Sequence, residues 1–112
     1  MDITSLYDKL VFHDDKPAIA VMIDNDHTKE IRIAFKSGHE MKEHKTKFPI
    51  VIQIVEGQID FGVEGRRVQL PKGSLIALEG NVPHDLKAME DSVVRLSLSK
   101  HDAVSRVAQV VV

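Results

Sequence analysis

Histidine is the residue type in this chain whose number and spacing point most directly to chemistry. The 112 residues include six histidines and no cysteine, so any transition metal would be bound by imidazole and carboxylate groups alone. The absence of cysteine excludes a thiol nucleophile, a thiolate zinc site, an iron–sulfur cluster and a disulfide. An imidazole titrates at about pH 6.5, so histidines can also bind or sense a polar ligand. Which of the six lie together depends on the elements that carry them.

Other catalytic patterns are missing from the sequence. The serines do not sit in a nucleophile-elbow sequence, and no glycine-rich phosphate loop occurs. Fifteen basic and 17 acidic side chains give a net charge of -2, which provides no long-range attraction for nucleic acid. No apolar run approaches the roughly 20 residues that cross a bilayer, and the chain does not start with a basic signal region. We therefore expect a cytoplasmic protein that binds neither nucleic acid nor a membrane.

The pattern of apolar residues predicts short β-strands within one domain, residues 1–112. Apolar and polar residues alternate over 58–63 and again over 66–70, and the turn residues Glu64 and Gly65 between them indicate a hairpin. Further strands are expected over 18–23, 31–36, 44–54, 74–78, 85–88 and 92–99. Many short strands separated by turn residues are typical of an all-β fold, and we expect a single-domain antiparallel β-barrel.

Helices are expected only at the two ends of the chain. Thr4 is a suitable N-cap, and Leu6, Leu10 and Val11 follow it at helical spacing, which predicts a short N-terminal helix. Residues 102–109 fit a short closing helix with an apolar stripe. The valine tail over 110–112 fits a strand equally well, so both interpretations of the C-terminal end stay open.

The segment 48–55 is apolar on both faces, although a strand with one solvated face should alternate. Something must therefore cover its outer face. One cover is the N-terminal helix or a second layer of the same chain. The other is a second subunit, packed against Val51 and Val55 in a homodimer. We expect a homodimer, with Pro49 at the start or edge of the strand because proline cannot donate to a ladder.

Two stretches of the sequence share a spacing of glycines and histidines. The first, about 38–57, contains Gly38, His44, Thr46, Ile50 and Gly57; the second, about 73–88, contains Gly73, Glu79, Asn81 and His84. This pair resembles the two motifs of the cupin superfamily, whose members are small β-barrels with the double-stranded β-helix, or jelly-roll-like, fold. The resemblance spans about residues 31–100 and implies that fold for most of the chain.

Strand alternation places the candidate site residues independently of the resemblance. His44 and Thr46 are two residues apart on one expected strand, so they share a face, and the same parity continues to Ile50. We expect this face to be the barrel interior. Pro83 stiffens the loop that presents His84. His44, Thr46 and His84 are therefore the expected site.

In metal-binding cupins the resemblance implies four ligands, two histidines and a carboxylate from the first motif and one histidine from the second. Those positions are His44, Thr46, Ile50 and His84 in this sequence. Only the two histidines ligate well, which is fewer than the three protein ligands of a catalytic zinc site. Glu79, in the loop before His84, is the acidic residue that remains as a replacement. A divalent metal such as Fe, Mn, Zn or Ni is therefore less favoured than no metal.

Three roles for the two histidines remain open. The favoured function is a stand-alone module that binds or senses a small polar or anionic metabolite near His44, Thr46 and His84. The alternative is a metal-dependent enzyme of the dioxygenase or isomerase type that uses His44 and His84 as metal ligands. The third is that both are remnants with a packing role alone. The sequence names neither a ligand nor a reaction.

Overall fold

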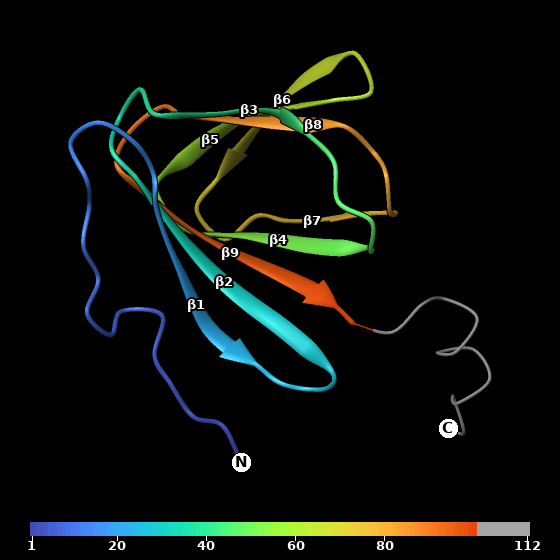
Figure 1. Cartoon of the computed structure of the whole chain (residues 1–112). Helices are drawn as coiled ribbons and strands as arrows, with labels where there is room; N and C mark the ends of the chain where they lie inside the picture. The colour runs from blue at the N-terminus through green and yellow to red at the C-terminus, as the bar shows by residue number, and fades with distance from the viewer. Residues whose placement is uncertain (101–112) are drawn as a thin grey trace.

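The computed structural model describes residues 1–100, which form nine antiparallel β-strands in two sheets (Figure 1). The strands are β1 (Ala18–Asp24), β2 (Thr28–Phe35), β3 (Glu40–His44), β4 (Ile50–Glu56), β5 (Gln58–Val63), β6 (Arg66–Pro71), β7 (Leu75–Leu78), β8 (His84–Ala88) and β9 (Ser92–Ser99). The described part of the chain contains no helix. The expected all-β, antiparallel fold is confirmed.

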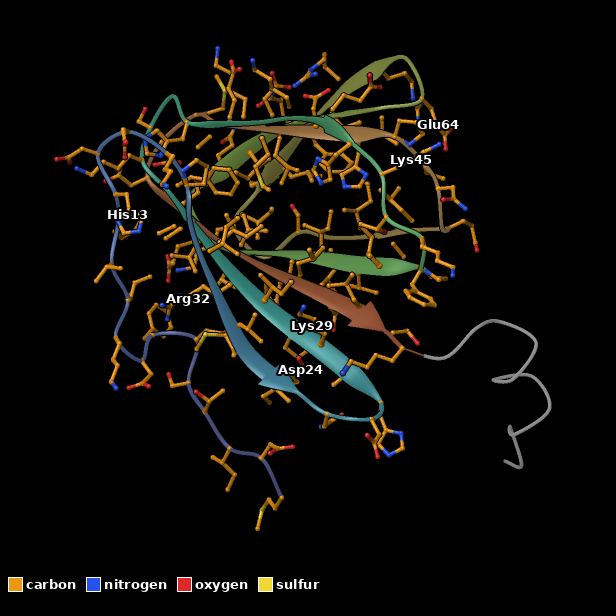
Figure 2. All side chains as sticks on the ribbon, viewed as in Figure 1. His13, Asp24, Lys29, Arg32, Lys45 and Glu64 are labelled. Atoms are coloured by element: carbon orange, nitrogen blue, oxygen red, sulfur yellow. The ribbon has the colours of Figure 1, made fainter. Side chains whose placement is uncertain are left out.

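The two sheets face each other and enclose the core between them (Figure 2). One has five strands in the order β1-β2-β9-β4-β7, and the other has four in the order β3-β8-β5-β6. The core consists of the side chains that alternate strand residues send inward: Ile33, Phe35, Ile50, Ile52, Ile54, Ile59, Phe61, Val63, Leu70, Leu86, Ala88 and Val94. Burying each of the larger ones stabilises the fold by about 1.5–3 kcal/mol.

Residues 44–54 do not form the single strand that their alternation predicted. β3 ends at His44, and β4 begins at Ile50 in the other sheet. Residues 45–49 cross between the sheets. Pro49, which cannot donate to a ladder, directly precedes β4 and so lies outside it. The inward parity of β4 is as expected, since Ile50 is buried and Val51 is 43% exposed.

Residues 1–17 form turns and an extended segment, so the expected N-terminal helix is wrong. Two isolated turns close with bonds from the Asp8 amide to the Ser5 carbonyl (3.0 Å) and from the Leu10 amide to the Tyr7 carbonyl (3.3 Å). Lys9 then takes a φ of 50°, in the left-handed region, which a continuing helix does not allow.

The N-terminal segment is instead tied to the outer face of the five-stranded sheet. The guanidinium of Arg32 on β2 donates to the carbonyls of Leu6 (2.9 Å) and Asp8 (2.7 Å), carbonyls that a helix would have used for its own ladder. Figure 2 shows Arg32 beside this segment. The Tyr7 hydroxyl also donates to a Glu56 carboxylate oxygen (2.7 Å) at the end of β4. The same chain thus supplies part of the cover that this face needs.

The expected C-terminal helix over 102–109 and the tail 110–112 lie outside the described residues. Within residues 1–100, no helix is long and apolar enough to cross a membrane.

Candidate functional site

His44 and His84 lie opposite each other at one end of the four-stranded sheet. His44 is the last residue of β3, His84 is the first of β8, and the ladder pairs them directly. Their ring centroids are 4.4 Å apart, with the ring planes inclined by 59°. The His84 side chain is buried, at 2% exposure, and the Phe61 ring stacks beside it at 5.8 Å. The structure therefore brings together the two histidines that the sequence singled out.

Both imidazoles are held in the same tautomer. Nδ1 of His44 lies 2.9 Å from the Lys42 carbonyl oxygen, and Nδ1 of His84 lies 2.9 Å from the Val82 carbonyl oxygen. A carbonyl only accepts, so each Nδ1 carries a proton and donates it. In a neutral ring of this tautomer the lone pair is on Nε2, and neither Nε2 has a hydrogen-bond partner within residues 1–100. The pair offers two acceptor nitrogens.

The histidines line a small cavity inside the barrel. Its volume is about 20 Å³, and apart from the two imidazoles its walls are apolar: Ile33, Met41, Ile52, Leu86, Val94 and Leu96. A cavity needs roughly 10–15 Å³ to hold one water molecule, so this space holds one water-sized group. The two imidazoles supply all of its polar side-chain atoms.

Sequence reasoning missed Met41 as a wall residue. Met41 and His44 are three positions apart, so a regular strand would point them to opposite faces. The β3–β8 ladder shifts register between Met41 and His44, and this bulge turns both side chains inward. The strand pattern in the sequence carries no signal for a bulge of this kind.

Burial lowers the pKa of His84 below its usual value of 6.5. The nearby His44 ring lowers it further, whereas the hydrogen bond to Val82 and the charge of Asp85 act in the opposite direction. Because the net change is downward, His84 is neutral at pH 7. Its Nε2 is then an acceptor and not a donor.

Comparison with known proteins identifies the family of this chain. The family model of the AraC-like ligand-binding domain matches residues 29–98. The chain belongs to this family. Its match covers both histidines, all of β3 to β8, and β2 and β9 except for one end residue each. The cupin superfamily expected from the two motifs is confirmed. No curated protein sequence matches the chain.

Solved cupins share the fold at low sequence identity. An RmlC-like cupin from Desulfovibrio desulfuricans has 21% identity and a TM-score of 0.82 over 89% of this chain and 97% of its own. An uncharacterised double-stranded β-helix protein from Klebsiella pneumoniae has 13% identity and a TM-score of 0.80, covering 90% and 91%. An RmlC-like cupin from Shewanella frigidimarina has 18% identity and a TM-score of 0.76, covering 94% and 96%. These likenesses support the fold and nothing finer.

The donor set of this cupin domain does not fit the four-ligand metal site that the motifs imply. The Thr46 hydroxyl donates to the Phe48 carbonyl (2.8 Å) in the loop between β3 and β4, and Ile50 is part of the apolar core. Two imidazoles therefore remain, and within residues 1–100 no group of three or more His, Asp or Glu side chains is placed to hold a metal ion. Zinc and iron centres use at least three protein ligands.

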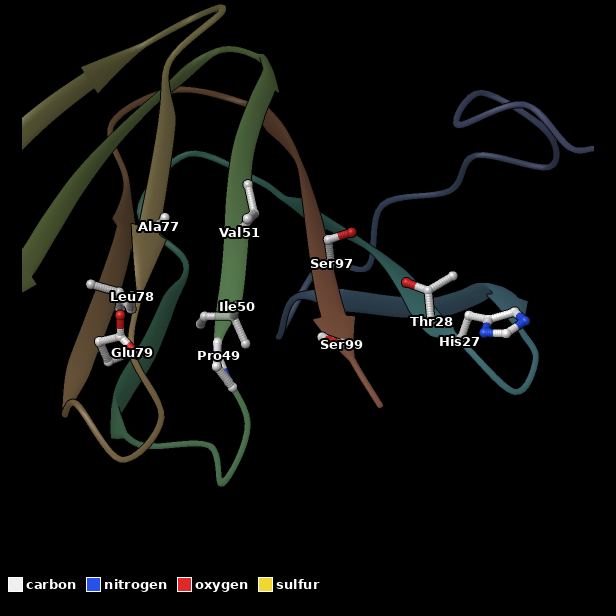
Figure 3. A pocket seen from close by; sticks show the side chains of 10 residues that line it. All are labelled: His27, Thr28, Pro49, Ile50, Val51, Ala77, Leu78, Glu79, Ser97 and Ser99. Carbon is white, nitrogen blue, oxygen red and sulfur yellow. The ribbon is translucent and has the colours of Figure 1, made fainter. Parts of the chain in front are cut away.

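Glu79 lies in a different pocket from the histidines. It is exposed in the loop after β7 and borders an open hollow of about 570 Å³ on the outside of the cupin domain, shown in Figure 3. This hollow is lined by His27, Thr28, Pro49, Ile50, Val51, Ala77, Leu78, Glu79, Ser97 and Ser99. Glu79 is not among the residues that line the histidine cavity.

Two loops meet beside the histidines and close this end of the barrel. The Asn81 amide donates to the Thr46 carbonyl (2.7 Å), and Asn81 has a φ of 65°, as its place in a tight turn requires. Gly80 lies so close to the other loop that a Cβ would be 2.4 Å from the Lys47 carbonyl oxygen. We call this contact between loops 45–49 and 79–83 the loop clasp. Thr46 belongs to the clasp and not to the strand of His44.

Proposed function

We propose that this cupin domain binds a small, uncharged, polar ligand at the histidine end of the barrel and acts as a binding or sensing module. The observation that carries the proposal is the pair of Nε2 acceptors of His44 and His84, set in an otherwise apolar cavity. A hydrogen-bond donor placed in the cavity can bond to these nitrogens. Membership of a ligand-binding family supports the same function.

The protonation state of the site determines which ligands match it. Nε2 of the neutral His84 imidazole accepts a hydrogen bond, so the matching ligand presents a hydroxyl or amide N–H donor to it. An anion would need a protonated imidazole, and the lowered pKa of His84 opposes that at neutral pH. Of the polar and anionic ligands expected from the sequence, the structure therefore favours polar, uncharged ones.

The size of the cavity limits how much of the ligand enters. About 20 Å³ admits one hydroxyl or amide group in place of one water molecule. The remainder of the ligand then lies at the mouth, against the loop that contains Thr46. This geometry selects ligands that have a donor group at one end over compact anions.

A thermal-shift screen tests the proposal. The purified protein is heated with a panel of polyols, sugars and amides, and separately with carboxylates and phosphates of similar size. We expect ligands from the first group to raise the melting temperature and the second group to leave it unchanged. At 100 times the Kd, a ligand stabilises the folded state by about 2.7 kcal/mol.

Variants identify the site. In the double variant His44→Phe, His84→Phe both acceptors are lost while the rings keep their approximate volume, so the ligand-induced shift should disappear. His13→Phe, an exposed histidine outside the site, is the matched control and should keep the shift. A panel without a single hit, or an unchanged shift in the double variant, would contradict the proposal.

The metal-dependent enzyme remains a second candidate because of one observation. Hydrogen bonds from Nδ1 to carbonyls fix both rings with Nε2 free, which is how ligating histidines are usually oriented. Elemental analysis of protein purified without a histidine tag tests it. Less than about a tenth of an equivalent of transition metal, unchanged after reconstitution, excludes this candidate.

A further inference from the structure

The outer face of the five-stranded sheet contains a long open trough. Its larger part is the hollow of about 570 Å³ shown in Figure 3, and a second hollow of about 230 Å³ continues it toward Leu75 and Arg95. Val51 and Ser97 line both hollows, so we treat the two as one feature and call it the outer trough. Among residues 1–100, none before His27 lines it.

The floor of the outer trough carries exposed aliphatic side chains. Val51 on β4 is 43% exposed and Leu75 on β7 is 67% exposed. Ala77, which pairs with Val51 in the β4–β7 ladder, lies beside them. Val51 belongs to the segment 48–55, which is apolar on both faces and is therefore expected to have a cover. An apolar occupant of the outer trough would remove these side chains from water.

The described part of the chain ends at the rim of the outer trough. Ser99, the last residue of β9, lines it, and the Lys100 amide donates to the carbonyl of His27 (3.2 Å), which also lines it. The outer trough crosses four strands from β2 to β7, a width of about 14 Å at the usual strand spacing. The twelve residues 101–112 would span about 18 Å as a helix and about 40 Å when extended. They can reach across the outer trough in either conformation.

We propose that residues 101–112 lie in the outer trough of their own chain and cover Val51. This segment, HDAVSRVAQVVV, contains five valines and two alanines, a composition that matches an apolar floor. Its Arg106 also matches Glu79, which is exposed at the rim and has no ion-pair partner within residues 1–100. The segment thus supplies both the apolar side chains and the positive charge that the outer trough can accept.

Covalent attachment favours this segment over a second copy of the chain. A segment that starts at the rim meets the outer trough at an effective concentration in roughly the millimolar range, whereas a second copy must associate from solution. In this position the segment also lies against the loop clasp, because Pro49 and Glu79, from its two loops, line the same trough.

Thiol labelling of the full-length chain tests the cover. The chain has no cysteine, so Val51→Cys introduces one reporter in the outer trough. Val21→Cys, at a valine that is 54% exposed on β1, is the matched reporter outside it. We expect Val51→Cys to react with a maleimide at least about tenfold more slowly than Val21→Cys, because a covered thiol reacts only after local opening. Adding Val107→Asp and Val110→Asp should abolish this protection and leave the rate of Val21→Cys unchanged.

Two results of the labelling experiment would overturn the proposal. Equal rates for Val51→Cys and Val21→Cys would show that the outer trough is open. Slow labelling of Val51→Cys that is unaffected by Val107→Asp and Val110→Asp would show that something else covers it. If that protection is also lost on dilution, the occupant is a second copy.

A charge exchange tests the pairing of Glu79 with Arg106. Glu79→Arg or Arg106→Glu alone brings like charges together and should speed the labelling of Val51→Cys. The double variant restores opposite charges and should restore the protection, at high and low protein concentration alike. A double variant that labels as fast as the single ones, or that is protected only at high concentration, contradicts the proposal.

Discussion

His44 and His84 are directly opposed in the β3–β8 ladder, and Nδ1 of each ring lies at hydrogen-bond distance from a backbone carbonyl oxygen, which leaves Nε2 as the nitrogen available to a ligand. This relationship determines what the site can do. Two imidazole nitrogens in an otherwise apolar wall match a ligand with a hydrogen-bond donor. They are two ligands short of the metal site that the motifs imply.

Stability should fall as the pH decreases below 6.5, because His84 is neutral in the fold. Its pKa in the folded state is lowered by burial, so between that value and 6.5 the unfolded chain binds more protons than the folded one. The contribution of His84 is complete above pH 6.5 and is lost progressively on acidification, with a slope of at most about 1.4 kcal/mol per pH unit. Urea unfolding at pH 7.5 and at pH 5.5 measures it.

The variant His84→Gln separates this effect from general acid sensitivity. Gln does not titrate, so the difference in unfolding free energy between the two pH values should shrink. His13→Gln at the exposed surface should behave as the wild type does. Equal pH dependence in all three proteins would show that His84 is not the titrating group.

Much of this arrangement can be predicted from the sequence, because alternation and turn residues depend on local chemistry. The hairpin around Glu64 and Gly65 and the inward parity of Ile50 both follow from a period of two. The position of Thr46 cannot be predicted in the same way. Its parity continues that of His44 in the sequence, but the chain leaves the sheet after His44, and parity holds only within one strand.

Two further features depend on contacts between distant segments and so have no local signal. The N-terminal segment has helical spacing, yet the guanidinium of Arg32, more than 20 residues away, binds its carbonyls. Met41 lines the cavity only because a bulge in the β3–β8 ladder re-aims it. In both cases tertiary packing overrides the local pattern.

Removing Arg95 should destabilise the protein, because a buried carboxylate depends on it. Arg95 pairs with Glu30 (2.7 Å), which is buried on the outer face of β2 and also accepts a hydrogen bond from Ser97. Although burial raises the pKa of Glu30, hydrogen bonds from Ser97, Thr28 and Arg95 lower it overall, so it is charged at neutral pH. Arg95→Met should cost about 2 kcal/mol of unfolding free energy, measured in urea.

The matched control for this variant is Lys87→Met. The Lys87–Glu40 pair is longer (3.9 Å) and both side chains are about half exposed, so its loss should change stability little. If Lys87→Met lowers the free energy of unfolding as much as Arg95→Met does, then burial of Glu30 does not explain how much the Arg95–Glu30 pair stabilises the fold.

Gly57 should tolerate alanine much less well than Gly65 does, although both have a positive φ. A Cβ at Gly57 would be 2.5 Å from the Asp91 carbonyl oxygen and 2.7 Å from the Ser92 Cα, which are backbone atoms, whereas a Cβ at Gly65 meets nothing within 4 Å. Gly65→Ala therefore bears only the left-handed cost of about 1–2 kcal/mol. In Gly57→Ala the start of β9 must also move, so thermal unfolding should show a clearly larger loss of stability. Similar losses in the two variants would contradict this.

Opening the loop clasp should enlarge the entrance to the histidine cavity. Gly80→Ala places a Cβ within 2.4 Å of the Lys47 carbonyl oxygen, so loops 45–49 and 79–83 must move apart, and the bond from the Asn81 amide to the Thr46 carbonyl should weaken. Hydrogen exchange of the Asn81 amide measures this, because exchange follows local opening. Exchange should become faster in Gly80→Ala and stay unchanged in Gly73→Ala, where the added Cβ meets nothing.

If the loops gate the cavity, ligands that raise the melting temperature of the wild type should associate faster with Gly80→Ala. Faster exchange without faster association would mean that the ligand enters the barrel by another route.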